Sequence, residues 1–579
     1  MASTPNYDAK VKAILDATTL GERVCAITGE KWTQDSKELE IYRRFNVPPL
    51  KICTNALWKW MAFYDAGFQF WWNKHAETGK PVLSFHHPAS GIRVLPDVEW
   101  HAKDFSTITA DVDPTKSFFD QLRALELCVP FMATFDRQPP ENSITLFSFG
   151  DRNSYFTFAC QSERCFFSAG AFQAEGSSLL WLTNQITDSH WILKSDRLFR
   201  CRYVRESLDC IDSAFLFDCR NCQNCFGVVN KRNRQYLFMN EQLSRAEYEA
   251  RMLTIDLGKR SEVEKYSQQF DALLAKEGVW PENFNVNTQE SVGEYLVNAV
   301  RSQQCFAAAD APTDQYRSAW SYGLNQHNAN MWGSIDSSDC YMSVACPNSS
   351  KSNFSYRSFR LDNCEFCVMS SDLRDCFGCV GLKKKRFCIF NKQYTEEEYW
   401  RIVDEIKSAM LERGEYGTYL PTALSTTFVP ESGAVVYTGA SPEELAMFGG
   451  NLFGAEDDGA TGADRIDPSK ARKREDIPDA IDDLTDEWVG VPIYDEVSKR
   501  TFTFLRPEVE HYRRLRVAPP NIHFIRRLHE VSHAGQVAAF EPASCTKCQQ
   551  AVTIAKNIRY PHRRIYCRAC YTAFVEKNG

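Results

Sequence analysis

The chain has 579 residues, which is too long for one hydrophobic core and predicts about three to five domains. Hydrophobic residues make up 44% of it and charged residues 25%, so wholesale disorder is excluded. The modest net charge of −8 argues against a chain that coats nucleic acid along its whole length. At the N-terminus no basic stretch precedes a long apolar run, and no later stretch reaches the ~18 apolar residues of a membrane helix, so we expect a cytoplasmic protein without a membrane partner.

The segment 42–49, which reads YRRFNVPP, has a counterpart near the other end of the chain. Residues 512–519 read YRRLRVAP, at a constant offset of 470. Each of the two follows an amphipathic stretch. Because the same motif recurs at both ends of a long chain, we expect a duplicated end module.

The segments 225–248 and 376–399 are two copies of a second repeated unit. They align without a gap, and short apolar or aromatic runs alternate upstream of each copy with turns rich in Ser, Asp and Asn. Successive runs lie about 10 to 14 residues apart, which suits strand–turn units. We expect a parallel stacked coil with two strands per turn, and an antiparallel sandwich is the alternative. The matched positions include Cys225 with Cys376, Asn240 with Asn391, and Tyr248 with Tyr399.

A helical segment is predicted after each copy, at 244–276 and at 395–412. Ser244 and Thr395 stand where N-cap residues are expected. Each repeat block therefore ends in a helix.

The cysteines of the repeat blocks follow the strand–turn rhythm. Asn or Asp precedes several of them, as in Asp209-Cys210 and Asn221-Cys222. Small residues that recur at one place in each coil stack into an interior ladder, where free Cys packs as a small hydrophobe. We favour this interpretation, and extra zinc knuckles are the alternative. The cysteines concerned are Cys210, Cys219, Cys222, Cys225, Cys340, Cys364, Cys367, Cys376 and Cys379.

The end of the chain changes sign. The segment 456–487 is strongly acidic, whereas 498–579 carries 15 Lys and Arg against 5 Asp and Glu. Arginine interleaved with aromatic residues suits phosphates and stacked bases, so RNA or DNA is an expected partner of this basic segment. A solvated basic face, or one that docks on the acidic segment, is the alternative. The expected nucleic-acid-binding residues are Arg513, Arg514, Arg526, Arg527, Arg559, Arg563, Arg564 and Arg568.

A motif of the zinc-protease type, His529-Glu530-Val531-Ser532-His533, fits the pattern H-E-x-x-H. Arg526 and Arg527 crowd the turn before it, and no third ligand stands at a familiar distance. A basic helix face is the favoured interpretation, and a zinc metallohydrolase is a remote alternative.

Two C-x2-C pairs close the chain and predict a zinc site. Cys545 and Cys548 form the first pair, Cys567 and Cys570 form the second, and the intervening segment alternates as a β-ribbon would. Four thiolates complete a tetrahedral shell with no open position. We therefore expect one structural Zn²⁺, which holds a small fold that lacks a core of its own.

Three segments resemble a known group of proteins: IYRRFNVPP at 41–49, PTKSFFDQLRALELCVPFMATF at 114–135 and IFNKQYTEEEY at 389–399. The chain resembles uncharacterised, cysteine-rich multi-zinc-ribbon proteins of ultra-small candidate-phyla bacteria. Members look like tandem C-x2-C ribbons followed by N-C-x2-C repeats, and the likeness spans most of the chain outside roughly 420–487. The resemblance implies an architecture and supplies no activity.

The chain departs from that family pattern in its N-terminal ribbons. Where the first ribbon would have two C-x2-C pairs, this chain has Cys25 with Thr28 and Cys53 with Ala56; where the second would have two more, it has His75 with Thr78 and Pro96 with Glu99. The resemblance therefore implies an N-terminal module that has lost its zinc. Core residues would then stabilise the module in place of the zinc, namely Trp58, Trp60, Phe63, Trp71 and Trp72.

The predicted fold is mixed and mainly β, with two solenoid-like blocks between two zinc-ribbon-type modules. The expected domains are a degenerate module at 1–110, repeat blocks at 111–276 and 277–425, an acidic flexible linker at 426–487 and a basic zinc-ribbon module at 488–579.

The expected function is that of a non-enzymatic, zinc-containing binding or scaffold protein. The sequence has no glycine-rich phosphate loop and no G-x-S-x-G elbow, and its carboxylates show no spacing that pairs them for acid–base work. A role in protein assembly, in which the solenoid blocks self-associate or present a face to another protein, is the alternative.

Overall fold

The chain forms two compact units, each assembled from segments that are distant in sequence. The computed structural model describes residues 4–309, 312–320, 329–330, 332–333, 341–344, 350–451, 453–454 and 468–579. Unit 1 consists of Met1–Ala133, Asn283–Phe453 and Ala538–Phe540, and unit 2 of Thr134–Glu282, Gly454–Val537 and Glu541–Gly579. The N-terminal segment thus belongs with the second repeat block, and the C-terminal segment belongs with the first.

The fold is mixed, as expected, but strands do not dominate it. Helix and strand each account for 29% of the residues that the structure describes. Much of the repeat region pairs through single bridges between neighbouring coils instead of extended strands. Among the described residues, no helix is both long enough and apolar enough to span a membrane.

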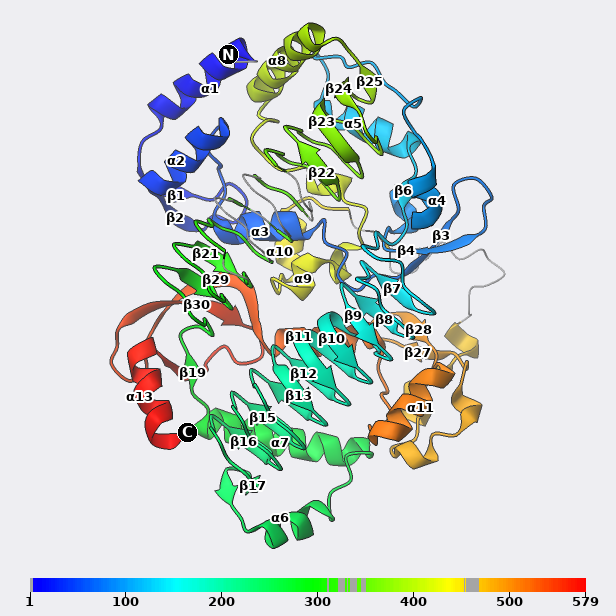
Figure 1. Ribbon diagram of the computed structural model, residues 1–579, viewed down its shortest axis with the longest axis vertical. Helices are drawn as coiled ribbons and strands as arrows, with labels where there is room; N and C mark the ends of the chain where they lie inside the picture. The colour runs from blue at the N-terminus through cyan, green and yellow to red at the C-terminus, as the bar shows by residue number, and fades with distance from the viewer. Residues whose placement is uncertain are drawn as a thin grey trace. The chain divides into compact units, whose positions relative to one another are not determined.

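A stack of parallel strands, which we call the first ladder, runs through unit 2 (Figure 1). Its register is regular, so that Leu180, Ile192, Val204, Leu216 and Val228 lie one above another. The step from one rung to the next, as from Leu180 to Ile192, agrees with the predicted spacing of the apolar runs. The parallel pairing rules out the antiparallel sandwich for these strands. The ladder comprises β7 (Ile144–Leu146), β8 (Tyr155–Phe158), β9 (Gln161–Glu163), β10 (Ala169–Glu175), β11 (Ser178–Thr187), β12 (His190–Leu193), β13 (Asp196–Phe199), β14 (Arg202–Arg205), β15 (Ala214–Phe217), β16 (Phe226–Val229), β17 (Leu237–Phe238) and β18 (Glu241–Gln242), the last of which pairs antiparallel.

The backbone of the first ladder turns at every third residue. From Asp188 to Met239, a residue with φ between 46° and 66° recurs at this interval. The residue that follows each turn commonly points inward, as Ser189, Ile192 and Cys201 do. Asn and Asp tolerate a left-handed conformation better than most residues do. This explains why they precede cysteines: Asp209, Asn221, Asn224, Asn363 and Asp375 all have positive φ.

Interior serines and cysteines supply hydrogen bonds that hold consecutive rungs together. Ser207 Oγ donates to the carbonyl of Arg205 at 2.9 Å and accepts from the backbone N–H of Cys219, one rung further on, at 3.0 Å. Ser189 and Ser213 make the same pair of bonds. Small polar side chains therefore satisfy buried backbone groups that bulky apolar residues would leave unpaired.

A second ladder lies in unit 1 and also pairs in parallel, with the register step of the first ladder in its later rungs. Its described strands are β20 (Val292–Glu294), β21 (Gln303–Phe306), β22 (Phe359–Asp362), β23 (Ser371–Phe377), β24 (Arg386–Ile389) and β25 (Lys392–Gln393), the last of which pairs antiparallel. Cys340, one of the expected interior cysteines, lies outside the described residues.

The two aligned segments end in the same local structure. Ser244 begins α6 (Arg245–Met252) and Thr395 begins α8 (Glu396–Arg413), each through a capping box with the Glu three residues later. Asn240 and Asn391 share a left-handed backbone and accept a hydrogen bond from the backbone of Val229 and Val380, respectively. The helix predicted over 244–276 is interrupted, because α6 ends at Met252 and α7 (Arg260–Glu277) follows a turn that contains Gly258.

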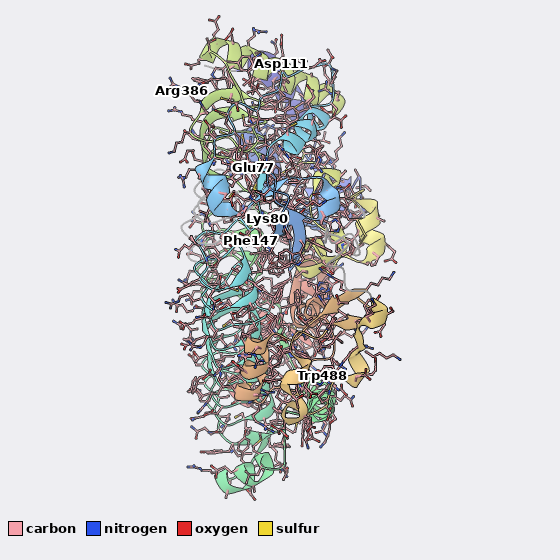
Figure 2. The ribbon with its side chains drawn as sticks, turned by 90° about the vertical axis from the view of Figure 1, so that its right-hand side faces the viewer. Glu77, Lys80, Asp111, Phe147, Arg386 and Trp488 are labelled. Carbon is pink, nitrogen blue, oxygen red and sulfur yellow. The ribbon has the colours of Figure 1, made fainter. Side chains whose placement is uncertain are left out.

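In unit 1 the N-terminal segment packs on the second ladder and on α8. The backbone N–H of Tyr7 donates to Asp404 at 2.8 Å, and the buried Arg317 pairs with the buried Glu38 at 2.9 Å. The elements are α1 (Pro5–Ala17), β1 (Gly21–Val24), β2 (Lys31–Gln34), α2 (Ser36–Phe45), α3 (Thr54–Ala62), β3 (Trp71–Lys74), β4 (Pro81–Ser84), η1 (Pro88–Ser90), β5 (Val94–Leu95), α4 (Asp97–Ala102), α5 (Phe118–Cys128) and β6 (Phe131–Met132). Glu77 and Lys80 lie at the turn between β3 and β4 (Figure 2).

The predicted linker 426–487 is not a bare linker at its described residues. Val429, Ala434 and Val436 are buried in unit 1, and Ile477 and Ile481 belong to a core cluster of unit 2. The prediction gives more weight to the acidic residues of this segment than to its apolar ones, and the apolar ones decide its packing. The elements here are η2 (Thr422–Leu424), η3 (Val429–Glu431), α9 (Gly433–Val436), α10 (Pro442–Met447), η4 (Pro468–Lys470), β26 (Arg472–Lys473), η5 (Arg474–Asp476), η6 (Ile481–Asp483) and η7 (Asp486–Trp488).

The C-terminal part of unit 2 repeats the order of the N-terminal segment, strand pair then helix. Its elements are β27 (Ile493–Asp495), β28 (Arg500–Phe502), α11 (Arg506–Leu515), α12 (Phe524–His533), β29 (Gln536–Ser544, apart from Ala538–Phe540, which belong to unit 1), β30 (Ala551–Asn557), β31 (Ile565–Tyr566) and α13 (Arg568–Asn578). β31 pairs in parallel with β19 (Trp280–Pro281), and the Trp488 ring (Figure 2) lies 4.5 Å from the Arg472 guanidinium. Tyr42 and Tyr512, matched by the offset of 470, each donate to a buried Glu one helical turn earlier.

Candidate metal centre and arginine-lined cavity

The four C-terminal cysteines converge. The sulfur atoms of Cys545, Cys548, Cys567 and Cys570 all lie within 4.8 Å of one another, and those of Cys548 and Cys567 are 3.7 Å apart. A tetrahedral zinc with Zn–S distances of about 2.3 Å requires sulfurs about 3.8 Å apart. The four residues therefore fit a metal ion such as zinc. Among the described residues this is the one group of three or more His, Cys, Asp or Glu side chains that converges in this way.

The backbone around these cysteines forms tight turns. Cys545 N–H donates to Gln550 at 2.8 Å, Gln549 N–H donates back to Cys545, and Thr546 N–H reaches the carbonyl of Ile565. Cys567 is the N-cap of α13, so the second pair of ligands begins a helix. Burial opposes ionisation of Cys545, but backbone N–H groups of Cys567, Cys548 and Lys547 lower its pKa to about 6. At Cys545 a thiolate, the form that binds metal, is thus favoured, whereas burial and the neighbouring thiols raise the pKa of Cys570.

The same backbone pattern recurs at Cys25. Its N–H donates to Glu30 at 2.8 Å, Gly29 N–H donates back to Cys25, and Ala26 N–H reaches Lys51. Cys53 is the N-cap of α3, and its thiol donates to Glu30 at 3.3 Å. Cys25 and Cys53 are both buried.

It recurs once more at His75. Its N–H donates to Lys80 at 2.8 Å, Gly79 N–H donates back, and Ala76 N–H reaches Val94. The ring Nε2 of His75 lies 3.0 Å from a carboxylate oxygen of Glu99, on α4. These are the two positions where the resemblance implied lost zinc ligands.

A fourth site corresponds to those at Cys545, Cys25 and His75. It lies in the C-terminal half and holds an ion pair. Asp495, fully buried, accepts from Arg526 at 2.9 and 3.0 Å and from the backbone N–H of His523, the N-cap of α12. With the offset of 470, Asp495 matches Cys25 and His523 matches Cys53. At three of these four places, namely Cys53 with Glu30, His75 with Glu99 and His523 with Asp495, a hydrogen bond or an ion pair connects the two paired segments. At the fourth, four thiols converge.

In the part of the chain that the structure describes, the H-E-x-x-H motif is not part of a converging group of three or more metal-binding side chains. It lies on α12, and the rings of His529 and His533 are 5.7 Å apart and stacked. Burial lowers the pKa of His529 to about 3 and raises the pKa of Glu530. Among the described residues, no third ligand joins these histidines. The ladder cysteines likewise sit in the apolar interior, as the clusters around Cys210 and Cys376 show.

The arginines expected to bind nucleic acid fall into separate places. Arg513 pairs with Asp486 at 3.0 Å, so this arginine contacts the acidic segment, as the alternative interpretation expects. Arg514 pairs with Asp188. Arg563 and Arg564 donate to the carbonyls of Ala555 and Lys276, and Arg568 is exposed. The other three, Arg526, Arg527 and Arg559, come together in the wall of one cavity.

This cavity lies within unit 2 and has a volume of about 500 Å³. One wall is the first ladder together with α7, and the other is the C-terminal segment that contains the repeated YRRLRVAP motif. The polar and charged wall includes six arginines against three carboxylates, and the apolar wall is largely aromatic. The arginines are Arg205, Arg260, Arg474, Arg526, Arg527 and Arg559; the carboxylates are Glu264, Asp271 and Glu530; the aromatic residues are Trp191, Tyr203, Phe215, Phe270 and Tyr512.

Asp271 neutralises part of this positive charge. It lies 2.6 Å from Arg559 and 3.3 Å from Arg205, and Tyr560 donates to it at 2.8 Å. Burial alone would raise the pKa of Asp271, but the two arginines outweigh this effect and lower it. Arg205 also lies over the rings of Trp191 and Tyr560.

Two other arginines of the wall are less compensated. Arg260 donates to the carbonyls of Pro519, Ile477 and Pro478, and among the described residues no carboxylate lies within ion-pair distance of it. Arg527 donates to Tyr512 at 2.8 Å, and its nearest carboxylate, Glu508, is 3.9 Å away.

The chain matches no protein-family model, and comparison with curated proteins and with solved structures finds no similar one. Sequence reasoning missed Arg205 and Arg260, because they stand far from the basic C-terminal segment, and Arg474, because it lies within the acidic segment. The run RCRYVRES, with arginines and an aromatic residue in one strand, is the signal that could have pointed to the ladder side of the cavity.

Proposed function

We propose that the chain is a non-enzymatic, zinc-containing protein that binds single-stranded nucleic acid through unit 2. The observation that carries this proposal is the cavity, in which an excess of arginines surrounds partly exposed aromatic rings. Arginine attracts the phosphate backbone, and aromatic faces stack on bases without regard to sequence. Such a combination is more specific than the basic composition of the C-terminal segment alone.

In this proposal the zinc is structural. Four thiolates close the coordination shell, so no position remains for a substrate or water. The metal would hold β29, β30 and α13 together, as metal-coupled folding does in small zinc domains. We further propose that the two ladders are β-solenoid repeats and that the segments flanking them are zinc-ribbon-type modules, in line with the family that the sequence resembles.

The experiment is fluorescence anisotropy of the full chain with a labelled 20-nucleotide RNA and with DNA of the same sequence, over a series of salt concentrations. The logarithm of the dissociation constant should rise linearly with the logarithm of salt concentration, with a slope near 0.7 per neutralised phosphate. Arg260→Gln should weaken binding and reduce the slope, and Arg260→Lys, which keeps the charge, should lose less. Arg568→Gln, at an exposed position outside the cavity, is the matched control.

Either of two results would contradict the proposal. One is no binding of either strand at low salt by a chain that native mass spectrometry shows to hold one zinc. The other is an Arg568→Gln variant that loses as much affinity as Arg260→Gln, since the contact surface would then be the ribbon face.

A further inference from the structure

Successive rungs of the first ladder build a column of aromatic rings into the wall of the cavity. Trp191, Tyr203 and Phe215 recur at the interval of the rungs, and each has φ between 55° and 58°. The rings of Tyr203 and Phe215 are stacked with centroids 4.7 Å apart, and those of Trp191 and Tyr203 are 6.3 Å apart. Phe215 is buried, whereas Trp191 and Tyr203 keep part of their surface exposed. The exposed parts of Trp191 and Tyr203, whose rings are tilted by 39° to each other, thus form an aromatic platform in the cavity wall.

In the second ladder, the rings at the corresponding positions are covered by other side chains of the protein. The offset of 151 between the two repeat copies matches Tyr203 with Phe354 and Phe215 with Phe366. Both phenylalanines are fully buried, because Tyr416 packs against each of them, at 5.6 and 6.0 Å. Phe118 also packs against Phe366 at 5.2 Å. In unit 1 the rings are covered by the chain itself, whereas in unit 2 the corresponding surface faces a cavity.

Charge is available beside the platform. Arg260 and Arg527 carry the least compensated positive charges of the wall, as their contacts above show. The Nε atoms of Arg205 and Arg527 are buried without a hydrogen-bond acceptor. Unsatisfied buried donors of this kind are found where a bound ion, water or ligand supplies the acceptor. His190, also in the wall, has a pKa well below its usual value because of burial, so it stays neutral and adds no charge.

We infer that the cavity binds one nucleotide unit, with the base stacked against Trp191 and Tyr203 and the phosphate held by the arginines. The volume of about 500 Å³ lies within the ~300–1,000 Å³ range of small-molecule sites. An anion without a ring would leave the aromatic column uncovered, and an apolar ligand would leave the arginines without acceptors. A nucleoside monophosphate, free or within a strand, satisfies both. This inference rests on the proposed function and assigns that function to a particular site.

The test is isothermal titration calorimetry of the zinc-loaded full chain with adenosine 5′-monophosphate, adenosine and inorganic phosphate. We expect adenosine 5′-monophosphate to bind at least about tenfold more tightly than either fragment. Trp191→Ala should weaken it by about 5- to 150-fold, the range that removal of one base–aromatic stack produces. Trp191→Phe, which keeps a ring, should retain most of the affinity, and near-ultraviolet circular dichroism confirms that both variants fold.

Binding of inorganic phosphate as tight as that of the nucleotide would overturn the inference, and so would a folded Trp191→Ala variant with unchanged affinity. If the labelled strands bind but the mononucleotide does not, the inference fails while the proposed function stands. If neither binds, both fail. Equal effects of Trp191→Ala on the mononucleotide and on the labelled RNA would place the strand in this cavity, and an effect on the mononucleotide alone would identify a free nucleotide as its ligand.

Discussion

Ser207 occupies an interior position of the first ladder, where it bonds to the backbone of two rungs. Its hydroxyl donates to Arg205 and accepts from the backbone N–H of Cys219. Ala fits the space but leaves the buried N–H of Cys219 without its acceptor, whereas the carbonyl of Arg205 still accepts from the backbone N–H of Asp218. The residue is therefore chosen for its hydrogen bonds as well as for its size.

Ser207→Ala should lower the free energy of unfolding by about 1–3 kcal/mol, the cost of leaving a buried donor unsatisfied. Ser207→Cys should cost less, because a thiol keeps a weak donor and a weak acceptor; at the next rung the thiol of Cys219 donates to the carbonyls of Phe217 and Val228. Urea unfolding followed by far-ultraviolet circular dichroism measures both. Thr107→Ala, at an exposed position, is the control. A Ser207→Ala variant no less stable than this control would show that the serine network contributes nothing.

His511 should make unit 2 sensitive to acid. Its Nε2 lies 2.9 Å from Ser178 Oγ, which in turn lies 2.8 Å from His190. Burial, assisted by Arg514, lowers the pKa of His511 from 6.5 to about 3. A folded-state pKa below the unfolded one means that the unfolded chain binds more protons between these values. The stabilisation is therefore complete above pH 6.5 and is lost as the pH falls from 6.5 toward 3, by up to about 1.4 kcal/mol per pH unit.

The measurement is the melting temperature between pH 7.5 and 5 for the wild type and for His511→Gln. We expect the wild-type value to fall over this range and the fall to be shallower in the variant. The cysteine site is the same in both proteins, so the difference between the two slopes isolates the histidine. Parallel slopes would show that His511 does not carry this pH dependence.

The tight turns at Cys25, His75 and Cys545 are the element that recurs along the chain. The same three backbone hydrogen bonds form at each, although four thiols meet at only one. At Cys25, two thiols are already present and the other two positions hold Thr28 and Ala56. The backbone geometry therefore does not depend on which side chains close it.

Thr28→Cys combined with Ala56→Cys should create a second zinc site with Cys25 and Cys53. Zinc released per chain, measured by a colorimetric chelator after denaturation, is expected to rise from one to two equivalents. The single substitution Thr28→Cys supplies only three thiols and is the matched control, for which one equivalent is expected. One equivalent in the double variant would mean that the turns at 25–28 and 53–56 lie too far apart or are wrongly oriented for four-thiolate binding.

At this scale the sequence predicts the elements well where a local rule decides them. The capping residues Ser244 and Thr395 begin helices, the strand interval is met, and the four C-terminal thiols converge. The prediction fails where packing is inferred from amino-acid composition alone. The acidic segment is predicted to be flexible because Asp and Glu are usually solvated, but Ile477 and Ile481 within it are buried.

The cavity is beyond sequence prediction for a physical reason. Its walls come from segments far apart in the chain, as Trp191 and Arg527 illustrate. The register that aligns Trp191 with Tyr203 is set by turns at every third residue, for which no simple hydrophobic period exists. The arginine contacts depend equally on tertiary structure: Arg513 and Arg514 meet carboxylates, whereas Arg260 meets carbonyls.

For the whole molecule, the main feature of the fold is that each terminal segment shares a unit with the repeat block that is more distant in sequence. The N-terminal segment shares a unit with the second ladder, and the C-terminal segment shares one with the first. Arg317 and Glu38 form a buried ion pair in unit 1 across 279 positions of the chain, and Arg205 and Tyr560 bond in unit 2 across 355. Long-range pairings of this kind form slowly, because long loops must close before the contacts stabilise them.

Removal of residues 1–110 should therefore expose the second ladder and spare the first. Loss of Glu38 leaves the buried Arg317 uncompensated, and loss of Tyr7 uncovers Tyr416, whereas the interior of the first ladder keeps all its contacts within unit 2. Amide hydrogen exchange should rise over 359–389 and stay low over 180–228. Removal of 488–579 is the reciprocal experiment, with the opposite pattern expected. If the first truncation instead deprotects 180–228 more than 359–389, the N-terminal segment stabilises the block it precedes, and the assignment of segments to units is wrong.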